Sequence, residues 1–344
     1  MSLFIITTKS YFTIFFLHSI HKPIKFCYNV IGDRMKKVGK FIAFIITIII
    51  GIGLFFYNDT ISNFILVNFI YKREIVVEEA NRYQKKQEVR YVKQTDQFEP
   101  KNRNDIMNIL YTILNNGWNS FTFYCDKEYK NCTEDVSNII ADKSLVSNLN
   151  NFVSPYNSYN QLHINYNSYG KITVEVDKIY SPEQIRLTEL EIERIMKEII
   201  TDNMSTEQKI KAFHDYIINH TIYDSENADK LKANQEIDIN ANSHNAYGLL
   251  YNHISLCGGY SDVMAIFLDK LGIPNIKVSN DSHVWNLVFL NNQWLHLDLT
   301  WDDPVTNTHE NLLLHNYFLI TNQELQTKDS QYHKFDTTIY PEGQ

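Results

Sequence analysis

Near its start the chain has a stretch that is apolar on every face. No residue from Phe41 to Asn58 carries a charge, and a run of about 18 such residues is close to the lower limit for a helix that spans a bilayer. Lys36, Lys37 and Lys40 precede it, which favours an N-terminus in the cytoplasm and the following residues outside. We therefore predict an uncleaved transmembrane anchor over residues 35–60, in preference to a buried core helix or a removed signal peptide.

Two segments flank this anchor. Residues 1–34 form an N-terminal extension of uncertain standing, because Met35-Lys36-Lys37 has the look of a natural start. The partly apolar stretch from Tyr11 to Leu17 leaves a second span open. Residues 72–101 are densely charged with both signs, which predicts a solvated stalk over residues 61–101 between the membrane and a globular part.

The pattern after the stalk predicts a small α+β domain over residues 102–180. Apolar residues at helical spacing indicate helices over 104–114 and 134–149. Residues 120–124, 162–166 and 171–176 alternate as strands do, and Asn167-Ser168-Tyr169-Gly170 joins the last two as a hairpin turn.

A larger region, residues 181–344, follows. Ser181-Pro182-Glu183 and the capping box Ser205-Thr206-Glu207-Gln208 each start a helix. Residues 224–243 are polar and lack periodicity, so we expect an exposed loop there. A further apolar helix starts at or beside Cys257 and ends before Gly272 and Pro274. Strands are predicted over 283–290 and 293–300, with Asn291-Asn292 as the turn between them.

Three residues of this region can supply nucleophilic chemistry. A thiol attacks only as the thiolate, and the N-terminus of a helix favours the anion, which is where Cys257 is expected. His283 begins the first strand of the hairpin, and the returning strand places Asp298 on the same face as Trp294 and His296. The hairpin can bring Asp298 beside His283, where a carboxylate would orient the base. Gly258 and Gly259 are expected to leave the approach to the sulfur open.

The order of these residues and their neighbours resembles the transglutaminase-like superfamily, a branch of the papain-like cysteine enzymes. The likeness rests on Leu256-Cys257-Gly258-Gly259-Tyr260, Ser282-His283-Val284-Trp285-Asn286 and Leu297-Asp298-Leu299-Thr300-Trp301-Asp302-Asp303-Pro304, and extends upstream through Ala246-Tyr247-Gly248 and the helix from Ser205, as in bacterial members. It covers about residues 182–304. It departs from many relatives at Gly258, where they carry a polar residue.

The resemblance implies roles for single residues. Cys257 would be the nucleophile, His283 the general base and acid, and Asp298 the orienting carboxylate. The chemistry would be acyl transfer from a glutamine side chain or peptide amide through a thioester, to an amine or to water. Tyr247 is a candidate oxyanion donor beside the Cys257 N–H, and Trp285 and Trp301 are candidate walls of the groove.

Other interpretations remain open at this point. A lone cysteine before an apolar helix is commonly a buried small hydrophobe, and a lone histidine in a strand is commonly structural. The runner-up is therefore a catalytically silent, membrane-tethered module that binds peptides or envelope polymer. A metal hydrolase is a third possibility, although the spacings of His214 with His220 and of His309 with His315 do not suit shared ligation, so we expect no metal site.

Composition and cysteine usage limit the class of partner and indicate the compartment. The net charge is −8, with no basic stripe, so nucleic acid is not expected. Outside the membrane, Cys125 and Cys132 are expected to form a local disulfide, which leaves Cys257 unpaired. We predict a membrane-anchored, extracytoplasmic enzyme without a cofactor that acts on protein or peptide, including cell-envelope material.

The predicted fold class is α+β. It consists of a papain-like or transglutaminase-like core, with the nucleophile's helix packed on an antiparallel sheet over residues 181–344. The small domain of residues 102–180 and the transmembrane helix precede it.

Overall fold

The computed structural model describes residues 23–57, 77, 91–126, 128–167, 170–233, 235, 242–305, 312–329 and 331–342. The chain divides into two compact units, residues 1–74 and 75–344. The second span considered for Tyr11–Leu17 and most of the predicted stalk lie outside the described residues. The boundaries of the predicted domains stay a prediction.

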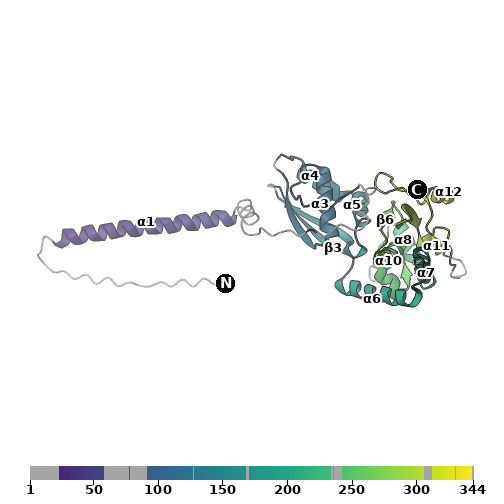
Figure 1. The fold of residues 1–344 in the computed structure, drawn as a ribbon. Coiled ribbons are helices and arrows are strands. Elements are labelled where there is room, and N and C mark those ends of the chain that lie inside the picture. The colour runs from purple at the N-terminus through teal and green to yellow at the C-terminus, as the bar shows by residue number, and fades with distance from the viewer. Residues whose placement is uncertain are drawn as a thin grey trace. The chain divides into compact units, whose positions relative to one another are not determined.

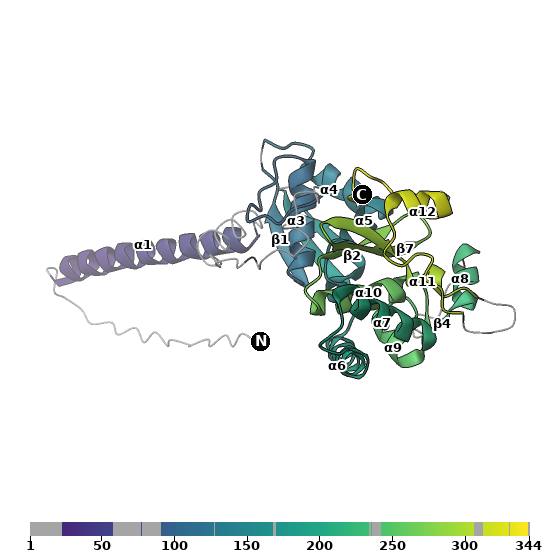
Figure 2. The same ribbon diagram turned by 45° about the vertical axis from the view of Figure 1, so that its right-hand side comes forward.

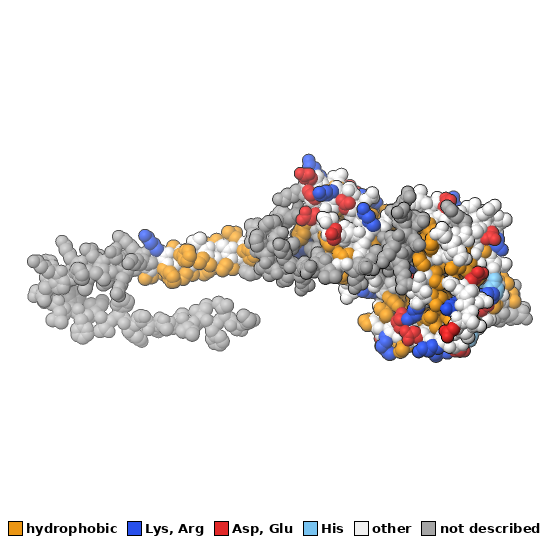
Figure 3. Space-filling view, viewed as in Figure 1, with side chains coloured by type: hydrophobic (Ala, Val, Ile, Leu, Met, Phe, Trp, Pro, Cys, Tyr) orange, Lys and Arg blue, Asp and Glu red, His pale blue; other side chains and the backbone are white. Residues whose placement is uncertain are grey.

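The first unit contains one long helix, α1, over Pro23–Tyr57 (Figure 1). Proline at the first position of a helix costs little, because the N–H that it lacks would have no acceptor there. Residues Val38–Phe55 have a mean hydropathy of 2.4, and none of this window is buried. Figure 3 shows apolar side chains along most of the coloured part of this helix. Its length and composition suit a membrane anchor, and a signal sequence shares these properties.

The second unit begins with helices and a three-stranded sheet. Helix α3 (Arg103–Asn115) precedes strand β1 (Ser120–Tyr124), and helices α4 (Cys132–Ala141) and α5 (Lys143–Asn150) follow. A short 3-10 helix (Pro155–Asn157) leads to strands β2 (Tyr159–Tyr166) and β3 (Lys171–Lys178). These strands form an antiparallel sheet in the order β1-β3-β2.

The structure of this region departs from the predicted helix over residues 134–149 and contains a disulfide. The single helix expected over 134–149 is interrupted at Asp142, whose carboxylate accepts the N–H of Leu145 at 3.0 Å and so starts a new helix. A disulfide joins Cys125, after β1, to Cys132 at the start of α4.

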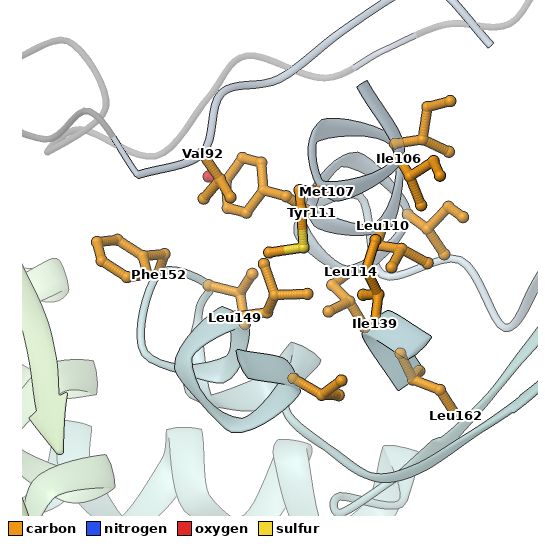
Figure 4. Close-up of a cluster of buried hydrophobic side chains, with 14 of the residues drawn as sticks. Val92, Ile106, Met107, Leu110, Tyr111, Leu114, Ile139, Leu149, Phe152 and Leu162 are labelled. Carbon is orange, nitrogen blue, oxygen red and sulfur yellow. The ribbon is translucent and has the colours of Figure 1, made fainter. Parts of the chain in front are cut away.

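Buried apolar side chains from α3, α4 and α5 form the first hydrophobic core (Figure 4). Ile106, Leu110 and Leu114 on α3 face Ile139 on α4, and Leu149 and Phe152 complete the cluster on the side of α5. The same core includes Ile276, Val278, Trp285, Leu287, Trp294 and Tyr340 from the far end of the sequence. The small α+β region therefore packs directly against the sheet that follows it.

The rest of the unit is built around helix α10 (Cys257–Lys270). Helices α6 (Pro182–Ile199) and α7 (Thr206–Asn219) begin with capping boxes from Ser181 and Ser205. Helix α9 (Ala246–Asn252) and the parallel pair β4 (Ile222–Tyr223) and β5 (Ile254–Ser255) complete the surroundings of α10. The expected loop over 224–243 is partly wrong, because Asp224 caps a helix, α8 (Ser225–Lys232).

An antiparallel sheet of strands β6 (Asn275–Ser279), β7 (Val284–Leu290) and β8 (Gln293–Leu297) packs on α10. Figure 2 shows α7 and α9 on the side of α10 away from this sheet. Trp285, Leu287 and Trp294 point into the first core, whereas Val288 and Leu297 belong to the second core around α10. A short helix α11 (Leu299–Asp302) follows β8, and α12 (Asn322–Lys328) lies near the end of the chain.

This arrangement confirms the predicted fold class. The helix that begins at Cys257 packs on an antiparallel sheet, as expected for a papain-like or transglutaminase-like core. A smaller α+β region and an N-terminal apolar helix precede it.

Candidate active site

Cys257 is the first residue of α10, as the apolar pattern predicted, and its thiol is free and half-buried. The residue before the helix, Leu256, has no side chain that can cap it. The first N–H groups of a helix have no acceptor inside the helix. At this helix the N–H of Gly259 donates to the carbonyl of Leu256 at 3.0 Å, so the N–H of Cys257 at the very start is the group placed to stabilise an anion such as a developing oxyanion.

The two glycines after Cys257 allow the close approach of a backbone segment. A Cβ on Gly258 would lie 2.6 Å from the carbonyl oxygen of His244, and one on Gly259 would lie 2.2 Å from Ser255 Oγ and 2.9 Å from the carbonyl oxygen of Asn245. The expectation that these glycines keep the sulfur accessible is therefore incomplete. Their observed function is to let residues 243–245 pack against the start of α10.

His283 and Asp298 meet, but not as a cross-strand pair. Nε2 of His283 lies 2.5 Å from Oδ2 of Asp298. Strand β7 begins one residue after His283, and β8 ends at Leu297 rather than at Thr300 as predicted. The register pairs Asn286 with Leu297, so the two residues meet diagonally beyond the ends of the ladder.

Asp298 ends its strand because its carboxylate caps the next helix. Oδ1 accepts the backbone N–H groups of Thr300 at 2.9 Å and Trp301 at 3.2 Å. Oδ2 accepts hydrogen bonds from His283 and, at 2.8 Å, from Nε2 of His333. Burial alone would raise the pKa of Asp298, but the charge of His283 and the hydrogen bonds from both rings outweigh it and hold the pKa well below its usual range.

The electrostatics of His283 favour a protonated ring. Burial disfavours the charged form, yet the charge and hydrogen bond of Asp298, together with a hydrogen bond to Cys257, raise the pKa of His283 to about 10. Because Nε2 faces Asp298, Nδ1 is the ring nitrogen left for the sulfur. The site can therefore hold an imidazolium beside the sulfur at neutral pH.

The two tryptophans differ in their surroundings. Trp285 is buried and stacks beside His283 with ring centres 5.5 Å apart, and its Nε1–H donates to Nδ1 of His296 at 3.0 Å. This places Trp285 in the core rather than on a groove wall. Trp301 is half-buried and lies 6.3 Å from the His283 ring, so it remains the candidate wall.

His296 is a neighbour of the site rather than part of it. Burial, with the positive charge of His333 adding to it, lowers the pKa of His296 to about 3. The ring is therefore neutral at ordinary pH and serves as the acceptor for Trp285.

Tyr223, rather than Tyr247, lies on the strand pair that leads into Cys257. Tyr247 lies on α9 and its ring packs 5.0 Å from that of Tyr251. Tyr223 is paired with Ser255 across β4 and β5, two residues before Cys257. Burial, and then the charge of Cys257, raise the pKa of Tyr223 to about 12. Its phenol therefore stays protonated and lies close enough to Cys257 to feel the charge on the sulfur.

Two clusters of ligand-type atoms occur among the described residues: His214, Asp215 and His315, and His283, Asp298 and His333. Ligand atoms around a tetrahedral zinc ion lie about 3.3 Å apart. The nitrogen-to-oxygen distances in these clusters are 2.5–2.9 Å, as in direct hydrogen bonds. Lys211 Nζ also lies 2.7 Å from Nε2 of His315, where it would repel a cation. Hydrogen bonding accounts for both clusters.

His333, like Tyr223, is a residue of this site that the sequence analysis missed. It is 35 positions from Asp298, in a segment without helical or strand periodicity. The segment is fixed to the site by Asn280, whose Oδ1 accepts the N–H of His283 at 3.0 Å and whose Nδ2 donates to the carbonyl of Tyr332 at 2.7 Å. No local pattern marks such a residue, since its role depends on how the chain end packs.

Part of the chain is similar to known proteins. Residues 193–299 match the family model described as "Transglutaminase-like superfamily". Among solved structures, the chain is similar to a TGase, with 18% identity, a TM-score of 0.32, and coverage of 44% of this chain and 48% of that one. It is also similar to a candidate cysteine protease from Cytophaga hutchinsonii, with 11% identity, a TM-score of 0.25, and coverage of 41% and 61%.

The matched region thus spans less than two thirds of either solved chain. No curated protein matches the chain. The family match encloses Cys257, His283 and Asp298. Residues 193–299 belong to the transglutaminase-like superfamily.

Proposed function

We propose that the protein is a cysteine acyltransferase or amidohydrolase in which Cys257, His283 and Asp298 form the catalytic triad. The observation that carries the proposal is their convergence. A half-buried thiol at an uncapped helix N-terminus interacts electrostatically with an imidazole and helps to raise its pKa, and a buried carboxylate binds that ring in turn. Each of the three has the partner that its role requires.

The reaction would proceed in two steps. The Cys257 thiolate attacks the carbonyl carbon of a glutamine side chain or peptide amide and forms a C–S bond. The C–N bond then breaks, and the amine leaves with the proton of His283. In the second step His283 takes a proton from an incoming amine or water, which attacks the thioester and releases the thiolate. The outcome is cross-linking with an amine, or deamidation or cleavage with water.

The developing oxyanion needs donors. The Cys257 N–H at the uncapped start of α10 is one. The phenol of Tyr223 is the second that we propose, in place of Tyr247, because it remains protonated and lies near the sulfur. Trp301 would form part of the groove beside the reacting atoms.

The proposed location is extracytoplasmic, with α1 as the anchor. Lys36 and Lys37 precede the apolar window Val38–Phe55 and Lys40 lies near its start, and the Cys125–Cys132 disulfide suits an oxidising compartment. Substrates would then be proteins or peptides outside the cytoplasm, including those of the cell envelope.

A thiol probe tests whether the site is active. The full chain in detergent is treated with iodoacetamide at neutral pH, and modification of Cys257 is followed by peptide mapping. We expect rapid labelling of the wild type, loss of it in His283→Ala, and no change in His220→Ala, a matched variant at an exposed histidine. Equal labelling of wild type and His283→Ala would favour a silent binding module.

A glutamine peptide and a primary amine then identify the reaction. Amine incorporation, deamidation and cleavage give three different changes of peptide mass. Cys257→Ala should give none of them. Loss of the reaction on chelation, with indifference to alkylation of Cys257, would instead indicate a metal hydrolase.

A further inference from the structure

His333 is a fully buried histidine between two carboxylates. Nε2 lies 2.8 Å from Oδ2 of Asp298, and Nδ1 lies 2.8 Å from Oδ2 of Asp329. The side chain has no solvent exposure. An ionised carboxylate only accepts hydrogen bonds, so each ring nitrogen must donate, and a ring with two N–H groups is an imidazolium.

The second carboxylate is itself held in place. Oδ1 of Asp329 accepts the backbone N–H groups of Gln331 and Tyr332, both at 3.0 Å. Burial would raise the pKa of Asp329, but these N–H groups and His333 lower it below its usual value. Asp329 therefore stays ionised and fixes the proton on Nδ1 of His333.

The two histidine rings share one oxygen atom. Oδ2 of Asp298 accepts from His283 on one side and from His333 on the other, and the ring centres lie 5.3 Å apart and nearly perpendicular. A positive charge on His333 therefore offsets part of the negative charge that Asp298 presents to His283. The same hydrogen bond prevents the carboxylate from turning away from His283.

From this geometry we infer that His333 is a positioning residue of the triad: held as an imidazolium between Asp298 and Asp329, it fixes the Asp298 carboxylate and limits how strongly Asp298 binds the proton of His283. The inference rests on the proposed function. Without His333, Asp298 would hold the proton on His283 more tightly, and the ring would deliver it less readily to the leaving amine.

The remaining groups around the ring do not replace this charge. The titratable groups that face His333, besides the two carboxylates, are His283, His296 and the phenol of Tyr317, whose ring stacks at 5.0 Å. His296 is neutral, and burial followed by the charges of Asp329, Asp298 and Asp302 raises the pKa of Tyr317. Trp285 and Trp301 pack edge-on at 5.0 and 4.8 Å and carry no charge. His333 is thus the one cation that faces Asp298 from the side opposite His283 among the described residues.

The test is the pH dependence of Cys257 alkylation in the full chain, which needs no substrate. For a thiolate–imidazolium pair, the plot of alkylation rate against pH has two limbs. One reports formation of the pair, and the other reports loss of the His283 proton. His333→Gln removes the charge and keeps an N–H that can reach Asp298. Removing a nearby positive charge raises both apparent pKa values, so both limbs should move to higher pH, by about one unit. His163→Gln, at an exposed histidine on β2, should leave both limbs in place.

Two results would overturn the inference while leaving the proposed function intact. One is a His333→Gln profile whose limbs coincide with those of the wild type. The other is a single limb near pH 8.5, the ordinary value for a free thiol, which would mean that His333 only supports the fold. The proposed function itself fails separately, if wild-type Cys257 shows no alkylation that depends on His283.

A second measurement applies if His333→Gln does not fold. In the wild-type chain with isotope-labelled histidine, the ring nitrogens of His333 should both carry protons at neutral pH, whereas His296 should carry one. A singly protonated His333 ring would contradict the inference.

Discussion

Nε2 of His283 lies 2.5 Å from Oδ2 of Asp298, although neither residue lies within a strand of the sheet that carries them. Their contact depends on the exact ends of β7 and β8. It also depends on the capping of α11 by the same carboxylate, which accepts the N–H groups of Thr300 and Trp301. One aspartate thus ends a strand, starts a helix and binds two histidines.

Substitution of this carboxylate should therefore affect stability and chemistry together. Asp298→Asn leaves the buried rings of His283 and His333 without an anionic acceptor, and we expect a loss of about 3–5 kcal/mol in unfolding free energy. Burial would then dominate at His283 and lower its pKa. We expect kcat to fall by about 10³-fold or more. Urea unfolding and the turnover of a glutamine peptide measure the two effects.

The contributions of His283 and Asp298 to the unfolding free energy change with pH in opposite directions. The pKa of His283 is raised in the folded state, so its contribution is complete below about pH 6.5 and is lost as the pH rises toward 10. The pKa of Asp298 is lowered, so its contribution is present above about pH 4 and is lost as the pH falls further. Asp298→Asn should flatten both slopes. Parallel stability curves for wild type and variant would contradict the assignment.

The proposed oxyanion donor is tested by a pair of tyrosines. Tyr223→Phe removes only the hydroxyl near Cys257, and we expect kcat with a glutamine peptide to fall by about 10²-fold. Alkylation of Cys257 by iodoacetamide creates no oxyanion, so its rate should hardly change. Tyr247→Phe is the matched control and should retain the wild-type kcat. A large loss in Tyr247→Phe with none in Tyr223→Phe would restore the donor that the sequence first suggested.

Local signals in the sequence predicted most of the elements that position the triad. The capping boxes at Ser181 and Ser205 mark the starts of α6 and α7. The turn Asn291-Asn292 adopts positive φ values of 51° and 65°, which asparagine tolerates. The helix at Cys257 followed from apolar spacing and from the glycine at 272, whose φ is 73°.

The features that were missed depend on contacts distant in sequence. Strand β6 is short and buried, and it is recognisable only through its pairing with β7. Tyr223 approaches the site through the parallel pairing of β4 with β5, and His333 through the packing of the chain end against Asp298 and Asn280. No periodicity carries such information, because tertiary packing alone decides it.

Gly259 should tolerate no side chain. A Cβ there would lie 2.2 Å from Ser255 Oγ, which is itself hydrogen-bonded to the carbonyls of Ser243 and Leu256, and 2.9 Å from the carbonyl of Asn245. We expect Gly259→Ala to lower the unfolding free energy by about 1–3 kcal/mol. It should also lower the alkylation rate of Cys257, because the start of α10 must shift. Gln326→Ala, at an exposed position on α12, should change stability by less than about 0.5 kcal/mol. A wild-type midpoint in urea for Gly259→Ala would show that residues 243–245 can move aside.

The Cys125–Cys132 disulfide provides a test of both stability and location. It closes a loop with a sequence separation of 7, and Cys132 is buried at the start of α4. Loop-closure entropy for such a short loop corresponds to about 2.5 kcal/mol, so the double variant Cys125→Ser with Cys132→Ser should unfold more readily by roughly that amount. The proposed outward orientation predicts that the pair is oxidised in intact cells, and that a maleimide unable to cross membranes labels Cys257 there. Reduced cysteines at both positions, with Cys257 labelled only after lysis, would place the domain on the cytoplasmic side and remove the argument for extracytoplasmic substrates.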